Sequence, residues 1–207
     1  RRDLRIEDNA GLYQALKSNN PVQCIFIFDK NILEKLDDCA DRRVTFIYQQ
    51  IEKLQLQLKS VNATLLVKYG DPIDIWKSLV NEYAIDKVFA NHDYEPYGIK
   101  RDQSLVDYFH TQLIQFNTYK DSVIFEKSEV VKENYLPYTV FTPYSKKWKT
   151  ILNPFYLKSY PSEKYLKQLN NTNNHSIIAF SELGFQWNDS YLPSNNIDID
   201  LIKNYDK

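Results

Sequence analysis

The chain has 207 residues, of which 43% are hydrophobic and 14% aromatic, which is enough to bury one good core. Such a composition excludes a disordered chain. The net charge of −1 gives no reason to expect tight nucleic-acid binding by this chain alone, because phosphate affinity comes from concentrated Lys and Arg. The sequence shows neither an apolar run of membrane-spanning length nor a signal peptide, so we expect a cytoplasmic protein without membrane contact.

The first residues, RRDLRIEDNAGL, form a dense charged turn followed by a helical pattern. Arg1, Arg2, Asp3 and Arg5 crowd together ahead of the apolar series that begins at Ala10. Because Asp3 lies inside the cluster, we expect a local salt-bridge network here.

Alternating apolar runs and helical periodicities follow as far as residue 125. Asp71 and Pro72 have the residue types of an N-cap and a first helical position. The expected strands are residues 22–28, 64–69 and 87–91, with two further short apolar pieces within 114–125. The expected helices begin near Ala10, Asp41 and Asp71 and surround the apolar residues Leu105, Val106 and Phe109.

This order predicts a doubly wound α/β fold with a five-stranded, parallel, Rossmann-like sheet. Crossover connections join strand to strand, so such a chain is expected to begin with a strand. Here the first element is a helix. We therefore expect the first strand to be partly or wholly missing from these residues, with a β-rich stretch ahead of Arg1 and its place in the middle of the sheet.

The character of the sequence changes after about residue 126. Tyr, Pro, Lys and then Asn and Ser dominate, apart from a short helical stretch at 144–152 and an island at 180–187. This composition is typical of a linker or of a segment that wraps a surface. We expect an α/β domain over residues 1–130 and a long interdomain connector over residues 131–207.

The spacing of the residues alone indicates no catalytic, metal-binding or phosphate-binding motif. The four glycines cannot form a phosphate-binding glycine loop, and the three histidines and two cysteines fit no metal site. His92 lies just beyond the carboxyl end of an expected strand, where α/β folds build ligand crevices. Because position alone is weak support for a function, a plain loop histidine is the favoured interpretation. Asp93 and Glu95 suit the start of a helix better than a catalytic pair. Trp148 suits a docking side chain.

The stretch RRDLRIEDNAGLYQAL resembles the start of DNA photolyases and cryptochromes, in which the same charged turn follows a first strand and faces the domain cleft. Further similar stretches occur in the family's order. They are FIFDKNIL, DRRVTFIYQQIEKLQLQL, NHDYEPYGIKRD, PYTVFTPYSKKW and FSELGF.

The resemblance implies a two-domain, light-driven DNA repair flavoprotein, a deoxyribodipyrimidine photo-lyase. Its N-terminal α/β domain would hold a light-harvesting antenna chromophore and pass energy to FAD in a C-terminal helical domain that also binds damaged DNA. Base flipping suits a lesion whose stacking is already weakened. Because nothing here matches the FAD or DNA residues, we name no catalytic residue and expect this fragment alone to be inactive. We expect a monomer.

The resemblance also indicates the antenna. In folate-binding relatives an Asn-Glu pair follows the Tyr-Glu of the matching segment, whereas Tyr97 and Gly98 stand here. A deazaflavin or flavin is therefore favoured over methenyltetrahydrofolate. Its expected contacts are Phe28, Asp29, Ile32, Leu33, Asp41 and Arg43. The alternative is that these residues only pack the loop and cap the helix that follows. The residues expected at the domain boundary are Arg2, Asp3, Arg5, His92 and Tyr94.

Two other functions remain open at this point. A cryptochrome, whose output is partner binding instead of repair, differs in residues around FAD that this chain does not contain. A nucleotide-binding α/β module acting without light would bind an adenine nucleotide at the carboxyl ends of the strands. That module leaves PYTVFTPYSKKW without an explanation.

Overall fold

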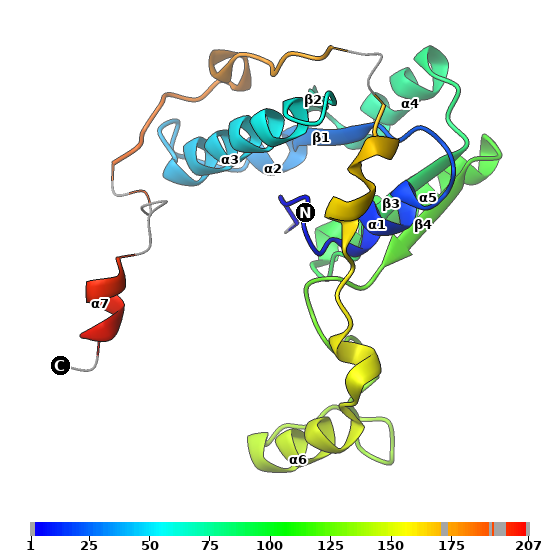
Figure 1. The fold of residues 1–207 in the computed structure, drawn as a ribbon, viewed down its shortest axis with the longest axis vertical. Helices are drawn as coiled ribbons and strands as arrows, with labels where there is room; N and C mark the ends of the chain where they lie inside the picture. Colours follow the sequence, from blue (N-terminus) through cyan, green and yellow to red (C-terminus); the bar gives the residue numbers. More distant parts are fainter. Residues whose placement is uncertain (1–2, 171–173, 191, 193–197, 206–207) are drawn as a thin grey trace.

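The computed structural model describes residues 3–170, 174–190, 192 and 198–205 (Figure 1). Helices and strands alternate through the first part of the chain, as the sequence pattern predicts. Its elements are α1 (Ala10–Leu16), β1 (Cys24–Asp29), α2 (Lys30–Leu33), α3 (Arg42–Lys59), β2 (Leu65–Gly70), α4 (Pro72–Glu82), β3 (Lys87–Asn91), α5 (Pro96–Thr111) and β4 (Gln115–Tyr119). Then follow α6 (Phe141–Ile151), the 3-10 helices η1 (Pro154–Leu157), η2 (Ser162–Gln168) and η3 (Phe180–Leu183), and α7 (Ile199–Lys203).

The strands form two parallel pairs. β1 pairs with β2 over six residues, and β3 pairs with β4 over five. The mixed α/β class is therefore confirmed, but the described residues form two two-stranded sheets and not one five-stranded sheet. The physical reason is that β1 and β3 line opposite sides of a cleft and do not pair with each other.

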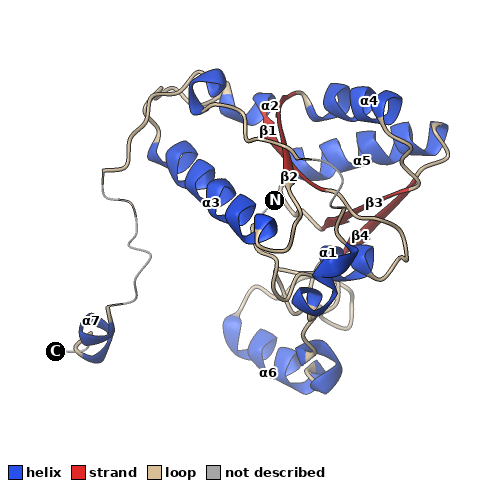
Figure 2. Ribbon diagram, turned by 45° about the horizontal axis from the view of Figure 1, so that its top comes forward, coloured by secondary structure: helices blue, strands red, loops and turns tan. Residues whose placement is uncertain are grey.

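Helices cover both sides of the strands (Figure 2). On one side, Val44, Ile51 and Leu58 of α3 pack with strand residues such as Val67 in the larger hydrophobic cluster. On the other side, Leu105 and Phe109 of α5 pack with Val88 of β3 and with residues of α4 in a second cluster. Strands covered on both faces are typical of parallel sheets.

Aspartates begin three of these helices, and two of them lie at strand ends. Backbone N–H groups of Asn31, Arg43 and Ile73 donate to the carboxylates of Asp29, Asp41 and Asp71 at 3.0, 2.8 and 2.8 Å respectively. Pro72 occupies the first position of α4, so the predicted cap at Asp71 is confirmed. A side chain that accepts such bonds satisfies N–H groups that have no partner within the helix.

Three side chains hold the start of α1, and two of them come from elsewhere in the chain. The N–H groups of Ala10, Gly11 and Leu12 donate to side-chain oxygens of Asp121, Asn91 and Asn9 at 2.9, 2.7 and 3.0 Å. The Gly11 backbone lies so close to Asn91 that a Cβ there would meet the Asn91 Oδ1 atom at 2.9 Å. This contact fixes α1 against the carboxyl end of β3.

The later part of the chain wraps the α/β body, as its composition predicts. Ser162 is fully buried, donates to the Ile6 carbonyl at 2.7 Å and accepts from the Asn9 N–H at 3.3 Å. Val22 and Leu169 form a parallel β-bridge. Leu183 belongs to the larger hydrophobic cluster. Whether residue 130 separates two units stays a prediction.

Helix α6 stands apart from the rest of the chain (Figure 1). None of its residues is buried, and Phe141 is 78% exposed. Trp148 packs edge-on against Phe125 with their ring centroids 5.4 Å apart, in agreement with the docking role predicted for it.

We predict that Gly11→Ala lowers the free energy of unfolding by about 1–3 kcal/mol, the usual cost of overpacking a tight site. Urea denaturation measures this effect. In an Asn91→Ala background the cost of Gly11→Ala should shrink, since the atom at 2.9 Å is then gone. Equal costs in both backgrounds would show that the Asn91 contact does not constrain Gly11.

Candidate functional site

Polar side chains gather where β1, β2 and β3 end. The carboxyl ends of parallel strands meet at one edge, and this edge is where α/β folds bind ligands. We call this region the carboxyl edge, defined by Asp29, Asp71 and Asn91 together with the residues that contact them. Three clusters occupy it.

The first cluster centres on Tyr97 and Arg101 of α5. The Tyr97 hydroxyl donates to Asp29 Oδ2 at 2.7 Å. Arg101 is only 13% exposed, and its guanidinium lies 3.2 Å from Asp93, 3.0 Å from Asp102 and 3.9 Å from Asp29. Burial first, and then the hydrogen bond to Asp29, raise the pKa of Tyr97 to about 12. The phenol therefore stays protonated at neutral pH and donates a hydrogen bond to a carboxylate.

Two neighbours extend this cluster. The Lys35 ammonium lies 5.3 Å from the centre of the Tyr97 ring. Asn31 donates from its side chain to Asp71 at 2.6 Å, and this bond lowers the pKa of the Asp71 carboxyl. The cluster thus combines carboxylates, a phenol and two cations around one aromatic ring, a set that can hydrogen-bond a polar aromatic ligand.

The second cluster involves the charged turn. Arg5 donates to Asp121 at 2.9 Å, although these residues are 116 positions apart. Asp3 accepts from the Asn91 side chain at 2.8 Å. The expected network within the turn is therefore wrong for Arg5, because its carboxylate partner lies on another element. For Asp3 the network stays a prediction, because Arg1 lies outside the described residues. Arg2 lies outside the described residues.

The third cluster links His92, Tyr94 and Glu126. The Tyr94 hydroxyl donates to Glu126 Oε2 at 2.6 Å, and His92 Nδ1 lies 2.8 Å from the same oxygen. Burial alone would raise the pKa of Glu126, but the hydrogen bonds from Tyr94 and His92 outweigh it and hold that pKa below its ordinary value. His92 Nε2 lies 3.1 Å from the Thr118 hydroxyl.

Two cavities adjoin these clusters. The larger, of about 870 Å³, runs between β1 and β3 and includes Asp3, Arg5, Asp29 and Arg101 in its walls. The smaller, of about 400 Å³, is lined by Asp3, Asn91, His92, Asp93, Tyr94, Glu95, Asp121, Ser122 and Val123. The predicted boundary residues Asp3, His92 and Tyr94 thus share one cavity.

The six residues predicted to contact an antenna do not share one cavity. Asp29 lines the larger cavity, and Ile32 beside it is 45% exposed. Phe28 and Leu33 are buried in the larger hydrophobic cluster. Asp41 caps α3 and pairs with the exposed Arg43 at 3.0 Å, which lowers the Asp41 pKa.

Sequence reasoning missed Arg101, Asp121 and Glu126. Each has a partner far away in the sequence (Asp29, Arg5 and His92 respectively), so no local pattern marks it. The spacing of four between Tyr97 and Arg101 places both on one face of α5, which is the one signal available beforehand.

We predict that ionisation of Tyr97 destabilises the fold at high pH. Its raised pKa makes a stabilising contribution that is fully present below pH 10 and is lost as the pH rises toward 12. Between pH 9 and about 11.5, the unfolding free energy of Tyr97→Phe should therefore fall less than that of the parent, by on the order of 1 kcal/mol. Parallel pH profiles in urea would contradict this account.

Comparisons with known proteins identify the family of this chain. The family model described as DNA photolyase matches residues 1–164. A deoxyribodipyrimidine photo-lyase from a Synechococcus strain is 29% identical over 154 residues, which are 74% of this chain and 32% of that protein. Cryptochrome-2 of Gallus gallus is 31% identical over 51% of this chain and 18% of its own length.

Two solved structures are similar. A photolyase from Sulfolobus tokodaii, described as holding two FAD molecules with implication of a novel light-harvesting cofactor, has a TM-score of 0.58 and 29% identity over 64% of this chain and 30% of its own. A class III photolyase from Agrobacterium tumefaciens has a TM-score of 0.74 over 94% of this chain and 38% of its own, and at 20% identity shows the fold alone.

In the described residues no helix is both long and apolar enough to span a bilayer. The chain spans about a third of the length of the photo-lyase that it matches (32%), and the family model covers most of it. With its parallel strand pairs and the polar clusters at their carboxyl ends, this chain belongs to the DNA photolyase family.

Proposed function

We propose that this chain is the N-terminal α/β domain of a light-driven DNA repair enzyme, a deoxyribodipyrimidine photo-lyase. It holds a light-harvesting chromophore and passes energy to FAD in a C-terminal domain, which binds the damaged DNA. The family match over residues 1–164 carries this proposal. The polar cluster around Tyr97 and Arg101 supports it, because it places hydrogen-bonding groups at the usual ligand edge of the fold.

The residues at the carboxyl edge suit a flavin or deazaflavin. Asp29 accepts hydrogen bonds, Arg101 and Lys35 provide positive charge, and Ile32 offers an exposed apolar surface beside them. When bound, the chromophore supplies light absorption, and these side chains bind and orient it. Phe28, Leu33, Asp41 and Arg43 are buried or paired elsewhere, so they support this site from outside it.

The local structure disfavours a folate. Gly98 is buried, and any side chain there would overlap the Asp93 carboxylate. The acid by which folate-binding relatives are expected to hold the pterin therefore has no room at this position. A deazaflavin or flavin remains the proposed antenna.

The finer expectations belong to the same proposal. The two strand pairs are the two halves of one five-stranded sheet in the whole protein. Asp3, Arg5, His92 and Tyr94 lie near the boundary with the flavin domain. The protein is a cytoplasmic monomer.

A cryptochrome is the second candidate. The 31% identity to Cryptochrome-2 of Gallus gallus, slightly above that of the photo-lyase, favours it. It would show light-dependent FAD reduction without repair. The nucleotide-binding module has no such support from the comparisons.

We predict that the whole protein repairs an oligonucleotide containing a cyclobutane pyrimidine dimer under blue light, whereas residues 1–207 alone do not. The reaction requires the FAD of the C-terminal domain, which lies outside residues 1–207 in this proposal. Loss of the dimer, followed by chromatography, measures repair, with a dark sample as control. Light-driven repair by residues 1–207 alone would contradict the assignment of FAD binding and repair to the C-terminal domain. FAD reduction without repair in the whole protein would favour the cryptochrome.

We predict that Arg101→Gln lowers the antenna content of the whole protein at least tenfold and leaves its FAD content unchanged. Lys100→Gln is the matched control, because Lys100 is the exposed neighbour on the same helix. Absorbance and mass spectrometry of the released chromophores measure both. A circular dichroism melt checks folding, and Asp29→Asn serves as a second variant. Equal antenna content in all variants would overturn this site.

A further inference from the structure

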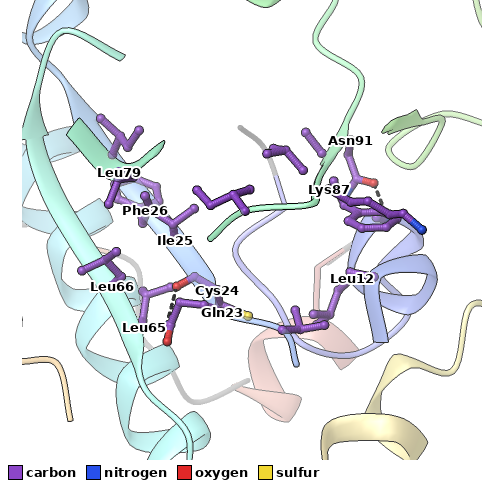
Figure 3. Close-up of a pocket in the computed structure, with 18 of the residues that line it drawn as sticks. Leu12, Gln23, Cys24, Ile25, Phe26, Leu65, Leu66, Leu79, Lys87 and Asn91 are labelled. Atoms are coloured by element: carbon purple, nitrogen blue, oxygen red, sulfur yellow. Dashed lines mark hydrogen bonds between the residues drawn. The ribbon is translucent and has the colours of Figure 1, made fainter. Parts of the chain in front are cut away.

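The two cavities that adjoin the clusters differ in chemistry. Apolar side chains such as Phe26, Leu66 and Leu79 line the larger one (Figure 3), and no histidine lies among the described residues that line it. The smaller one has His92 and Tyr94 in its wall, beside carboxylates. A side chain that can accept a proton near neutral pH therefore lies beside the smaller cavity.

A hydroxyl, an imidazole and a carboxylate form a chain of contacts beside the smaller cavity. The Thr118 hydroxyl lies 3.1 Å from His92 Nε2, and His92 Nδ1 lies 2.8 Å from Glu126 Oε2. A hydroxyl next to an imidazole that a carboxylate orients is an arrangement that activates the hydroxyl as a nucleophile. Thr118, His92 and Glu126 thus have the residue types and the order of a nucleophile, a general base and an orienting group.

The contacts of the His92 ring determine which nitrogen carries the hydrogen. Burial acts to raise the pKa of Glu126, but the hydrogen bonds from Tyr94 and His92 outweigh it and hold this pKa below its ordinary value. The carboxylate is therefore ionised at neutral pH and can only accept hydrogen bonds, so the neutral His92 ring carries its hydrogen on Nδ1. Nε2 then has the free lone pair, and the Thr118 hydroxyl donates to it.

The pairing of β3 with β4 holds the hydroxyl and the imidazole in place. Thr118 belongs to β4 and lies opposite Ala90 of β3. The His92 N–H continues this pairing by donating to the Tyr119 carbonyl at 2.7 Å. Thr118 is exposed and the His92 side chain is 22% exposed, so a small molecule can reach both. The two reacting groups are therefore positioned before any ligand binds.

We propose that Thr118 is an acyl-acceptor site, with His92 as its general base and Glu126 as the residue that positions the imidazole. Thr118 Oγ1 attacks the carbonyl carbon of an activated ester and forms a new C–O bond, while the hydroxyl proton passes to His92 Nε2. The bond from the carbonyl carbon to the leaving oxygen then breaks, and His92 gives the proton to that oxygen. This step uses neither FAD, DNA nor light, so it goes beyond the proposed repair function.

The charge of the smaller cavity limits which ester fits. Four carboxyl groups line this cavity, those of Asp3, Asp93, Glu95 and Asp121. Arg5 pairs with Asp121 and Arg101 with Asp93, but no Lys or Arg lies among the described residues that line the cavity. A negatively charged acyl group would meet like charges there. The site therefore favours small esters that are uncharged or cationic.

The experiment uses p-nitrophenyl acetate, an uncharged activated ester, with the whole protein. Peptide mass spectrometry over time measures the rate at which the Thr118 hydroxyl is acetylated. The Thr150 hydroxyl is the internal reference, because it is on an exposed residue and donates to the Lys146 carbonyl. His92→Gln removes the base, Thr118→Ser keeps the hydroxyl, and His110→Gln is the matched control at an exposed histidine. A circular dichroism melt checks that each variant folds.

We expect Thr118 to be acetylated at least about 100-fold faster than Thr150, which is the acceleration typical of a positioned general base. His92→Gln should remove this difference, whereas Thr118→Ser and His110→Gln should keep it. p-Nitrophenyl succinate, an anionic ester, should acylate Thr118 at least tenfold more slowly. Equal rates at Thr118 and Thr150, or a Thr118 rate unchanged in His92→Gln, would overturn the proposal. Equal rates with both esters would overturn the assigned substrate class.

Glu126→Gln tests the positioning role separately. The new side-chain amide can donate to Nδ1, which moves the ring hydrogen to Nε2, and Nε2 then no longer accepts from Thr118. We expect this variant to acetylate Thr118 as slowly as His92→Gln does. NMR of the ring nitrogens should show the hydrogen on Nδ1 in the parent and on Nε2 in the variant. A hydrogen on Nε2 in the parent, or the same tautomer in both proteins, would overturn the role of Glu126.

Discussion

Parallel strand pairing is the constraint on which the rest of this structure depends. Because β1 and β2 run in one direction, as do β3 and β4, the chain must leave each strand at the same edge. Asp29, Asp71 and the residues after Asn91 therefore gather at one place. A helix begins shortly after each of these strand ends, and the side chains that cap or flank the helices become the polar groups of the candidate site.

The sequence predicted the elements better than their assembly. Apolar periodicity located β1, β2 and β3 to within two residues, and Asp71 with Pro72 marked the start of α4. Of the two short pieces expected within residues 114–125, only the first corresponds to a strand, β4. Patterns of this kind depend on a few neighbouring residues, so they can be recognised without knowledge of the fold. Strand pairing depends on residues far apart in the chain, so the sequence pattern did not show that the described strands form two separate pairs with a cleft between them.

The same distinction explains the site. Asp29 and His92 were recognisable because each follows an apolar strand. Their partners were not, since Tyr97 belongs to a helix that starts after a different strand and Glu126 to a loop beyond β4. Arg5 shows this most clearly: its charge suggested a partner within its own turn, whereas its partner is Asp121, which follows β4 and lies 116 positions along the chain. Buried polar groups are worth most when fully paired, so such long-range bonds define the site's geometry.

The most direct test of the account is the wavelength dependence of repair by the whole protein. If this domain harvests light, the action spectrum of dimer repair follows the absorbance of the antenna chromophore in addition to that of reduced FAD, and the antenna's fluorescence is quenched while FAD is present. An action spectrum that matches reduced FAD alone, in protein shown to carry the antenna, would contradict the account.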